Sequence, residues 1–558
     1  MSGNPAATDA ALTCIATAKL TPTEHLLLKD LVESAVDPDG MARRVLQTVE
    51  EDSSRSTEES LRLLKEDWRR LISKLIHAPE IPSNFGDLAR CRHNSPCSLT
   101  GSSNPNDGKG VETAYIIPPT LVADPDMIPQ SAPLYSLLQS FLTAPKVSDL
   151  REMLFDESHK ARLRNMWLLS PSLHSAFRNG HIRIRPKMKV KWEEGDEIDV
   201  ADASEARYTA TKSFPGEFND LYFGDGSHYG RNIHQFTLRT NDPENLPLPS
   251  AFLLRIHCRF STALNLFSIE DQIARGWPRQ PSVLLDRKAQ QNIRTMWLLV
   301  PRFVRELCYR ALLKAGRYLY PSEGSELVRR VPFGLYIKEC SRSQENEPTS
   351  LDMVHKYTSV PAPLLVDTFR KHGDIFMVMT RVRGRALIDV FHLMSYEERD
   401  QFADDLGDYV AQLHSIPNHT PYLFADTNGG RMVDHRVPDQ EFGPFNSEAD
   451  FNNHLYHIGV SQKLKESIAL VHSRTHRSYF THSDLHPTNI LVEGGKLSGI
   501  IDWECGAFKP EYWEFTKAMY GVWNLKPMED MLRRAFGHQY EEELEVEQAL
   551  WKVTPFGI

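Results

Sequence analysis

The sequence predicts an α+β protein that is built from more than one domain. Its 558 residues exceed what one compact core usually holds, so two to four domains are expected. Helix signals fill the first 80 residues, where Thr21 and Ser56 each stand three positions before a glutamate, the pattern of a capping box. Towards the other end, a Gly-Gly pair separates two strand-like runs, 490–492 and 497–501, which indicates a β-hairpin.

The N-terminal helical region has one face suited to burial. From Leu61 to Ile76, apolar residues recur at three- and four-residue steps. This stripe could bind a partner helix, but packing on a neighbouring domain is the simpler interpretation. No run of 18 apolar residues occurs, and the first residues lack the features of a signal peptide. We therefore expect no membrane contact and a cytoplasmic, or else nuclear, protein.

The composition is that of an ordinary globular protein, with 41% hydrophobic and 25% charged residues. A net charge of −10 argues against general affinity for nucleic acid or anionic membranes. The exception is a basic stretch from Arg178 to Lys191, which could touch a phosphate backbone or form a solvated strand face. The seven cysteines are odd in number and irregularly spaced, as expected for reduced thiols.

Between the ends, a turn-rich linker is expected from Gly276 to Pro281, followed by a helical pattern from Lys288 to Arg317. The C-terminal part should be mostly helical, for example from Tyr396 to Leu413. The acid-rich run from Glu541 to Glu547 is most simply a solvated helix face. Binding of a cationic ligand is the alternative for that run.

One motif beside the predicted hairpin indicates phosphoryl-transfer chemistry. His482, Asp484 and Asn489 follow the spacing H-x-D-x-x-x-x-N, and Asp502 ends the second strand. Phosphoryl transfer needs a carboxylate near the attacking hydroxyl and oxygen ligands that hold Mg²⁺ against the phosphates. Asp484 suits the first role. Asn489 and Asp502 suit the second, because Mg²⁺ prefers oxygen donors. Taken singly, either aspartate could be an ordinary turn residue.

A second group of residues could hold the phosphates. Lys338 follows a β-rich run that begins at Val331, and a lysine so placed can pair with phosphates if an acid positions it. Glu347 is the candidate acid, because Glu347-Pro348 opens a helical pattern. The alternatives are a solvated lysine and a glutamate in a polar stretch. No G-x-G-x-x-G loop precedes Lys338, and Gly324 is the only glycine near the start of that strand.

These segments resemble the aminoglycoside phosphotransferase family, which has a choline-kinase-like and protein-kinase-like fold, in the version common in filamentous fungi. The resemblance covers about residues 325–558. Its further motifs are Arg330-Val-Pro-Phe-Gly-Leu-Tyr-Ile-Lys338, Thr358-Ser-Val-Pro-Ala-Pro363, Met379-Thr-Arg-Val-Arg-Gly384, Asp502-Trp-Glu504 and Pro510-Glu-Tyr-Trp-Glu514. It implies a bilobal domain that binds ATP and Mg²⁺, in which His482 braces the catalytic loop.

The middle of the chain is similar to a fungal HNH-endonuclease module with a ββα-metal fold. The residues that carry this similarity are Cys97-Ser-Leu-Thr-Gly101, Val111–Pro118, Asn165-Met-Trp-Leu-Leu169 and Leu173–Phe177. In that family a histidine activates water, an asparagine orients the loop and a helix histidine helps bind a divalent metal. Asn165 and His174 match the last two.

Tyr115 stands where that family has the activating histidine. A phenol with a pKa near ~10 is a poor general base at neutral pH. One remaining imidazole with no clear acidic co-ligand makes a weak metal site. His174 has a simple alternative as a hydrogen-bonded helix histidine. We expect a nuclease-like scaffold that has lost hydrolysis.

The complete prediction divides the chain into five segments. They are a helical region at 1–84, an HNH-like domain at 85–275, a linker with helices at 276–325, a nucleotide lobe at 326–382 and a helical lobe at 383–558. The expected function is ATP- and Mg²⁺-dependent transfer of the γ-phosphate to a hydroxyl of a small molecule. The alternatives are a non-catalytic binding or regulatory protein and an HNH endonuclease. Nucleotide and a small-molecule acceptor are the expected partners, with nucleic acid weakly supported; the fold does not fix the acceptor.

Overall fold

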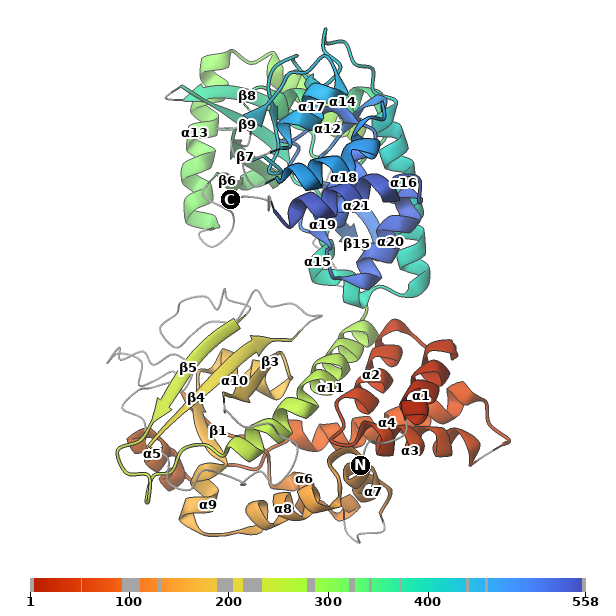
Figure 1. Ribbon diagram of the computed structural model, residues 1–558. Helices are drawn as coiled ribbons and strands as arrows, with labels where there is room; N and C mark the ends of the chain where they lie inside the picture. Colours follow the sequence, from red (N-terminus) through yellow and green to blue (C-terminus); the bar gives the residue numbers. More distant parts are fainter. Residues whose placement is uncertain are drawn as a thin grey trace. The chain divides into compact units, whose positions relative to one another are not determined.

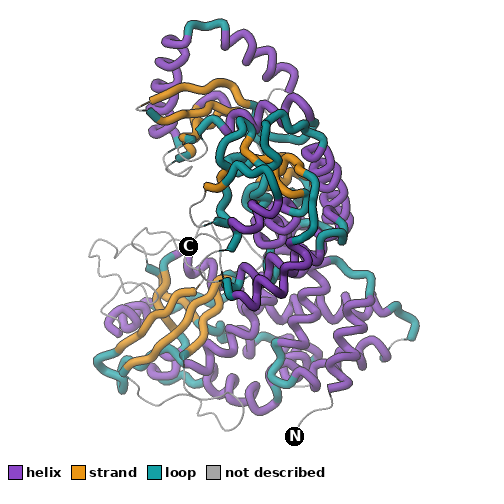
Figure 2. The backbone as a smooth tube through the Cα atoms, turned by 45° about the horizontal axis from the view of Figure 1, so that its top comes forward, coloured by secondary structure: helices purple, strands orange, loops and turns teal. Residues whose placement is uncertain are grey.

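The computed structural model describes residues 5–553, apart from the segments 52, 93–110, 128–131, 188–203, 214–232, 278–286, 321–326, 341–343, 372, 438–440 and 457–459 (Figure 1). The chain divides into two compact units, Met1–Gly276 and Trp277–Ile558. Both combine helices with small antiparallel sheets (Figure 2), which confirms the α+β class. Within the described residues, no helix is both long and apolar enough to cross a membrane.

The first unit begins with four helices, α1 (Pro5–Thr17), α2 (Pro22–Glu33), α3 (Pro38–Glu50) and α4 (Thr57–Ile76). Thr21 and Ser56 form the predicted capping boxes of α2 and α4. The apolar stripe of α4 is buried inside this unit. Trp68 packs on Phe141 and Phe260, with ring centroids 4.7 and 5.7 Å apart. The stripe is therefore part of the core of this unit and is not a surface for binding a partner helix.

The rest of this unit surrounds a small ββα arrangement. Its further elements are α5 (Ser83–Arg92), β1 (Glu112–Tyr115), α6 (Thr120–Ala123), η2 (Pro125–Met127), α7 (Pro133–Leu142), α8 (Ala144–Phe155), α9 (His159–Arg164), β2 (Met166–Leu169), α10 (Pro171–Arg178), β3 (Ile182–Pro186), β4 (Glu205–Lys212), β5 (Ile233–Arg239) and α11 (Ala251–Arg275). β1 pairs with β2, and α10 follows directly. Cys97–Gly101, Lys189 and Lys191 lie outside the described residues.

The second unit opens with a two-helix hairpin and a four-stranded sheet. The elements are α12 (Arg287–Leu298), α13 (Arg302–Leu319), β6 (Val328–Val331), η3 (Pro332–Gly334), β7 (Leu335–Glu339), α14 (Asn346–Tyr357), β8 (Leu365–Lys371) and β9 (Asp374–Thr380). The helical pattern predicted from Lys288 to Arg317 is thus two helices, divided near Pro301, which lacks the N–H that a helix interior needs. Residues 321–326, which include Gly324, are not described.

The two faces of this sheet have different surroundings: one packs in an apolar core, and the other carries Lys338. The strand order is β6-β7-β9-β8, and every pair is antiparallel. Successive side chains on a strand point to opposite faces. On β7, Ile337 therefore joins a core with Tyr309 of α13, whereas Lys338 faces the opposite side, where it contacts Glu347 of α14.

The remaining elements form a mostly helical lobe. They are β10 (Arg385–Ala386), α15 (Leu387–Val390), η4 (Phe391–Leu393), α16 (Tyr396–His414), β11 (Ala425–Asp426), β12 (Met432–Val433), β13 (Glu441–Phe442), α17 (Glu448–His454), α18 (Gln462–His472), β14 (Ser478–Thr481), β15 (Ile490–Glu493), β16 (Lys496–Ile500), β17 (Ala507–Pro510), α19 (Trp513–Gly521), α20 (Lys526–Phe536) and α21 (Glu541–Trp551). The predicted hairpin is present as β15 and β16, with Glu493 opposite Lys496.

The interpretation of the acid-rich run as a solvated face was wrong for two of its members. Glu543 and Glu547 on α21 are each 3% exposed. Glu543 forms an ion pair with Arg474 at 2.8 Å, and Glu547 forms one with Arg436 at 2.8 Å. Buried carboxylates need such partners, and these arginines come from distant segments that sequence spacing does not reveal.

Candidate functional site

The loop that carries the H-x-D-x-x-x-x-N motif runs between β14 and β15, and His482 braces it. This imidazole is fully buried, and burial lowers its pKa. Nε2 lies 3.0 Å from the carbonyl oxygen of Ile501, so Nε2 carries the proton and donates it. Nδ1 accepts a hydrogen bond from the backbone N–H of Asp484 at 3.2 Å. With both nitrogens engaged, His482 has a bracing geometry and no nitrogen to spare for proton transfer.

Glu514 on α19 holds the same loop through hydrogen bonds to its backbone. Its carboxylate accepts the backbone N–H groups of His482 and Ser483, the latter at 2.9 Å. Ser483 has a φ of 64°, which is strained for a residue with a Cβ and typical of functional loops. Burial raises the pKa of Glu514 to about 7. The sequence motif contained Glu514, but no role was assigned to it.

Asp484 and Asn489 are in direct contact. The Nδ2 group of Asn489 donates to the carbonyl oxygen of Asp484 at 3.0 Å and to its carboxylate at 2.8 Å. Asp484 is only partly buried, so a ligand can reach it. Because the amide nitrogen is committed to Asp484, the Oδ1 atom of Asn489 is the group that can face a cation.

Asp502 lies next to this pair because the hairpin returns the chain there. The backbone N–H of Ile501 donates to the carbonyl oxygen of Asn489 at 2.9 Å. Asp502 then adopts a φ of 65°, and its side chain is 39% exposed. A second strained residue thus stands at the site. The structure brings the predicted residues 482, 484, 489 and 502 together.

Lys338 and Glu347 complete the group across from this loop. The ammonium of Lys338 lies 2.9 Å from the carboxylate of Glu347 and also contacts Asp502. Glu504, which was not predicted, approaches it at 3.5 Å. Burial alone would lower the pKa of Lys338, but these three carboxylates raise it, so the lysine stays charged. Burial, reinforced by the neighbouring carboxylates of Asp502 and Glu504, raises the pKa of Glu347 to about 7.

The donor set suits a magnesium ion. One carboxylate oxygen from each of Glu347, Asp502 and Glu504 lies within 4.8 Å of the others. Hard oxygen ligands of this kind fit Mg²⁺, which usually keeps water and substrate phosphate in its shell.

Asp434, which was not predicted, is a buried carboxylate that binds three side chains of the helical lobe. It is fully buried and accepts from Lys517 and from the indole N–H of Trp513, both at 2.9 Å, and it also pairs with Lys509. Burial would raise the pKa of Asp434, but the two lysines outweigh burial and hold it well below its usual range. The next residue, His435, reaches Glu504 at 3.4 Å. These contacts join residues far apart in sequence, and no spacing rule reveals them.

The nuclease-like site is assembled only in part. The Asn165 side chain accepts a hydrogen bond from the N–H of Ile117 at 2.9 Å and donates one to its carbonyl oxygen at 2.7 Å. The expectation that His174 lacks an acidic neighbour was wrong, because Glu112 lies 2.7 Å from its Nδ1. Tyr115 is 8% exposed, and burial raises the pKa of its phenol. A phenol thus stands at the position where the HNH resemblance places the activating histidine.

A cleft of about 630 Å³ opens at this site. It is lined by Tyr115, His174 and Arg178 together with the segment from Ile76 to Arg90. Arg178 also donates towards the Nε2 of His174 at 3.4 Å. Glu112 and Arg178 thus contact the two imidazole nitrogens of His174, one each.

The comparison with protein families agrees with both halves of this description. Residues 324–550 match the family described as "Phosphotransferase enzyme family". The second unit contains a phosphotransferase-family domain. Residues 97–185 match the family described as "HNH endonuclease". Both family resemblances inferred from the sequence are confirmed, with an HNH-endonuclease segment ahead of a phosphotransferase segment. The fungal version of each stays a prediction.

Three phosphotransferases are among the solved structures that are similar to part of this chain. The aminoglycoside phosphotransferase APH(4)-Ia, in a thermostable mutant without ligand, is 15% identical, with 42% of this chain and 85% of that chain covered and a TM-score of 0.27. A macrolide 2′-phosphotransferase from Brachybacterium faecium is 17% identical, with coverage of 42% and 82% and a TM-score of 0.29. The type VIII aminoglycoside-3′-phosphotransferase is 16% identical, with 43% and 97% covered and a TM-score of 0.30. No curated protein matches the chain.

Proposed function

We propose that the second unit is a phosphotransferase that uses ATP and Mg²⁺ to phosphorylate a hydroxyl group of a small molecule. The observation that carries this proposal is the convergence of Lys338, Glu347 and Asp502 on one side of the site with the Asp484–Asn489 pair on the other. The nucleotide lobe at 326–382 would supply the first two residues, and the helical lobe at 383–558 the rest.

Each residue has a task that its surroundings allow. Asp484 would accept a hydrogen bond from the acceptor hydroxyl and orient it for attack, because its carboxylate is fixed by Asn489 yet accessible. Asn489 and Asp502 would hold the metal. Magnesium, when bound, neutralises charge on the phosphates. Lys338, charged and placed by Glu347, would hold the non-transferred phosphates.

The reacting group of the proposed acceptor is a hydroxyl. The carboxylates around the site favour an acceptor that carries positive charge, such as an amine-bearing alcohol or sugar.

The first unit is proposed to be a nuclease-like scaffold that does not hydrolyse phosphodiesters. The buried phenol of Tyr115 carries this part of the proposal, since a neutral phenol cannot activate water at neutral pH. Recognition of a ligand in the cleft beside His174, without turnover, is compatible with these contacts.

A phosphate-release assay tests the phosphotransferase. The full-length protein is incubated with γ-labelled ATP and Mg²⁺, with and without a panel of amine-bearing alcohols, and labelled phosphate or product is followed. We expect Mg²⁺-dependent turnover that is lost in Asp484→Asn. Turnover that is equal in wild type and Asp484→Asn would contradict the role proposed for Asp484. Absence of turnover in wild type would leave the binding or regulatory alternative in its place.

A further inference from the structure

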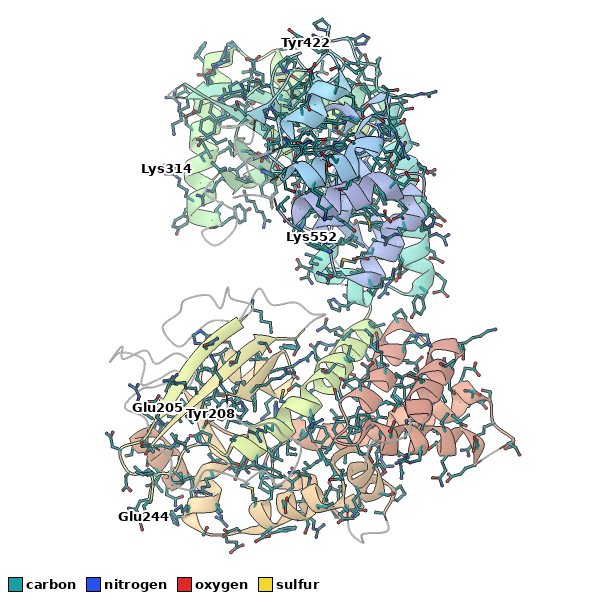
Figure 3. All side chains as sticks on the ribbon, viewed as in Figure 1. Glu205, Tyr208, Glu244, Lys314, Tyr422 and Lys552 are labelled. Carbon is teal, nitrogen blue, oxygen red and sulfur yellow. The ribbon has the colours of Figure 1, made fainter. Side chains whose placement is uncertain are left out.

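Two helices outside the matched phosphotransferase segment pack on the outer face of the nucleotide lobe. α12 and α13 together end at Leu319, whereas the family match begins at residue 324. The ring of Tyr309 on α13 stacks on Phe369 of β8, with centroids 5.3 Å apart. At Gly316, an added Cβ would meet the Arg330 carbonyl oxygen at 2.4 Å, so helix and strand are in close contact. The other side of α13 is exposed, as at Lys314 (Figure 3).

Polar contacts fix this two-helix hairpin on the sheet. Asp367 on β8 accepts a hydrogen bond from the Tyr309 hydroxyl at 2.8 Å and forms an ion pair with Arg305. The two side chains of this ion pair are only 13% and 11% exposed. Asp367 thus binds Arg305 and Tyr309 at once in a nearly buried position. Because these three side chains satisfy one another in this arrangement, they fix the position of the two-helix hairpin on the sheet.

In this position α12 contacts α14, the helix that carries Glu347. Arg294 forms a two-point ion pair with Asp352 of α14, with N–O distances of 3.0 and 3.3 Å. A planar guanidinium that meets both oxygens of a carboxylate fixes orientation as well as distance. Asp352 and Glu347 lie five residues apart on one helix, so a rotation or shift of α14 moves both.

The start of α14 is held from the opposite side. Asn346 is 3% exposed and donates to the carbonyl oxygens of Glu504 at 3.2 Å and Gly506 at 2.9 Å. These carbonyls belong to the loop that follows Asp502. α14 is therefore fixed between this loop and Arg294, and Glu347 lies between the two attachments.

We propose that the α12–α13 hairpin is a positioning device for the phosphate-holding pair, and that Arg294 sets the placement of Glu347 against Lys338. Arg294 acts through its ion pair with Asp352, so it is a positioning residue. The inference rests on the proposed function, because the Lys338–Glu347 pair matters only if the site holds a nucleotide. It assigns to a segment outside the phosphotransferase family match a direct influence on affinity for Mg·ATP.

Two measurements on the full-length protein test this. Calorimetric titration gives the Kd for Mg·ATP, and hydrogen–deuterium exchange reports the protection of residues 346–357. For Arg294→Ala we expect an affinity about fivefold weaker, the effect of about 1 kcal/mol, together with faster exchange in α14. Arg302→Ala is the matched control, because the ion pair of Arg302 with Glu306 lies within α13. It should leave both readings unchanged.

A charge swap separates positioning from simple stability. The double variant Arg294→Asp/Asp352→Arg restores the ion pair in reverse and should recover most of the affinity and protection. An Arg294→Ala protein that melts earlier yet binds Mg·ATP as tightly as wild type would overturn the positioning role alone. A wild-type protein that binds no Mg·ATP would overturn the proposed function and this inference together.

Discussion

One side-chain amide of Asn489 makes two hydrogen bonds to Asp484, at 3.0 Å to its carbonyl oxygen and 2.8 Å to its carboxylate. The nitrogen of this amide fixes the carboxylate that we assign to the acceptor hydroxyl. Its oxygen is left for the metal. One residue thus couples the acceptor side of the site to the phosphate side.

Replacing Asn489 by aspartate should test this double role. The variant keeps an oxygen ligand and the same shape, but it sets a carboxylate against Asp484 where a donor stood. We expect Mg²⁺-dependent phosphate release to fall by about a hundredfold, since small displacements of reacting groups carry costs of that order. The exposed hairpin residue Lys496, changed to alanine, is the control. An Asn489→Asp enzyme with wild-type kcat would refute the coupling.

Changing Glu514 to glutamine should weaken the catalytic loop. A carboxylate accepts the N–H groups of both His482 and Ser483, whereas the amide offers one oxygen and turns a donor towards the second N–H. The expected loss is about 1–3 kcal/mol in the free energy of unfolding, the cost of one buried unsatisfied group. Urea denaturation measures it, with Glu511→Gln as a less buried neighbour for comparison. Unchanged stability would show that Glu514 does not hold the loop.

The pH dependence of stability should carry a contribution from His476. Its ring lies 2.6 Å from Glu448 and 3.4 Å from Glu543. Burial would lower its pKa, but these carboxylates raise it to about 9. A raised pKa means that the stabilisation is complete below about pH 6.5 and is lost as the pH rises through 9.

His476→Gln should remove this contribution. The stability difference between wild type and variant is expected to shrink by up to about 3 kcal/mol between pH 6 and pH 9.5. Urea denaturation at a series of pH values gives that difference, and the exposed His419→Gln provides the comparison. A difference that is constant over this range would mean that His476 is not held as a charged ring.

Local sequence was sufficient for the hairpin and the loop it carries. β15, the Gly-Gly turn and β16 are neighbours in the chain, so Asn489 and Asp502 had to approach each other once the hairpin was recognised. Lys338 and Glu347 were found because a β-rich run leads into the lysine and the next helical pattern opens at the glutamate. Arg294 and Asp352, 58 positions apart, gave no such signal.

The residues that were missed share one property. Asp434 meets Lys509 and Lys517 across 75 and 83 positions, and Glu543 meets Arg474 across 69. Ion pairs of this kind depend on the tertiary fold, whereas spacing rules apply to one helix or hairpin. For the same reason Glu543 was mistaken for a solvated side chain.

The nuclease-like unit should leave DNA intact. With Mg²⁺ or Mn²⁺, we expect no nicking of supercoiled plasmid above the background of a His174→Ala variant, because Tyr115 cannot serve as a base. Gel electrophoresis over a metal titration is the measurement. Metal-dependent nicking by wild type that His174→Ala abolishes would restore the endonuclease alternative.

The most direct test of the central claim is the melting temperature of the full-length protein with ATP, with and without Mg²⁺. A ligand that binds the folded state raises its stability by mass action, at about 2.7 kcal/mol for a hundredfold excess over Kd. We predict that Mg·ATP raises the melting temperature of wild type by several degrees and that Asp502→Asn loses most of this metal-dependent part. A wild-type melting temperature that Mg·ATP does not change, or a shift that Asp502→Asn retains in full, would contradict a magnesium–nucleotide site built on Lys338, Asn489 and Asp502.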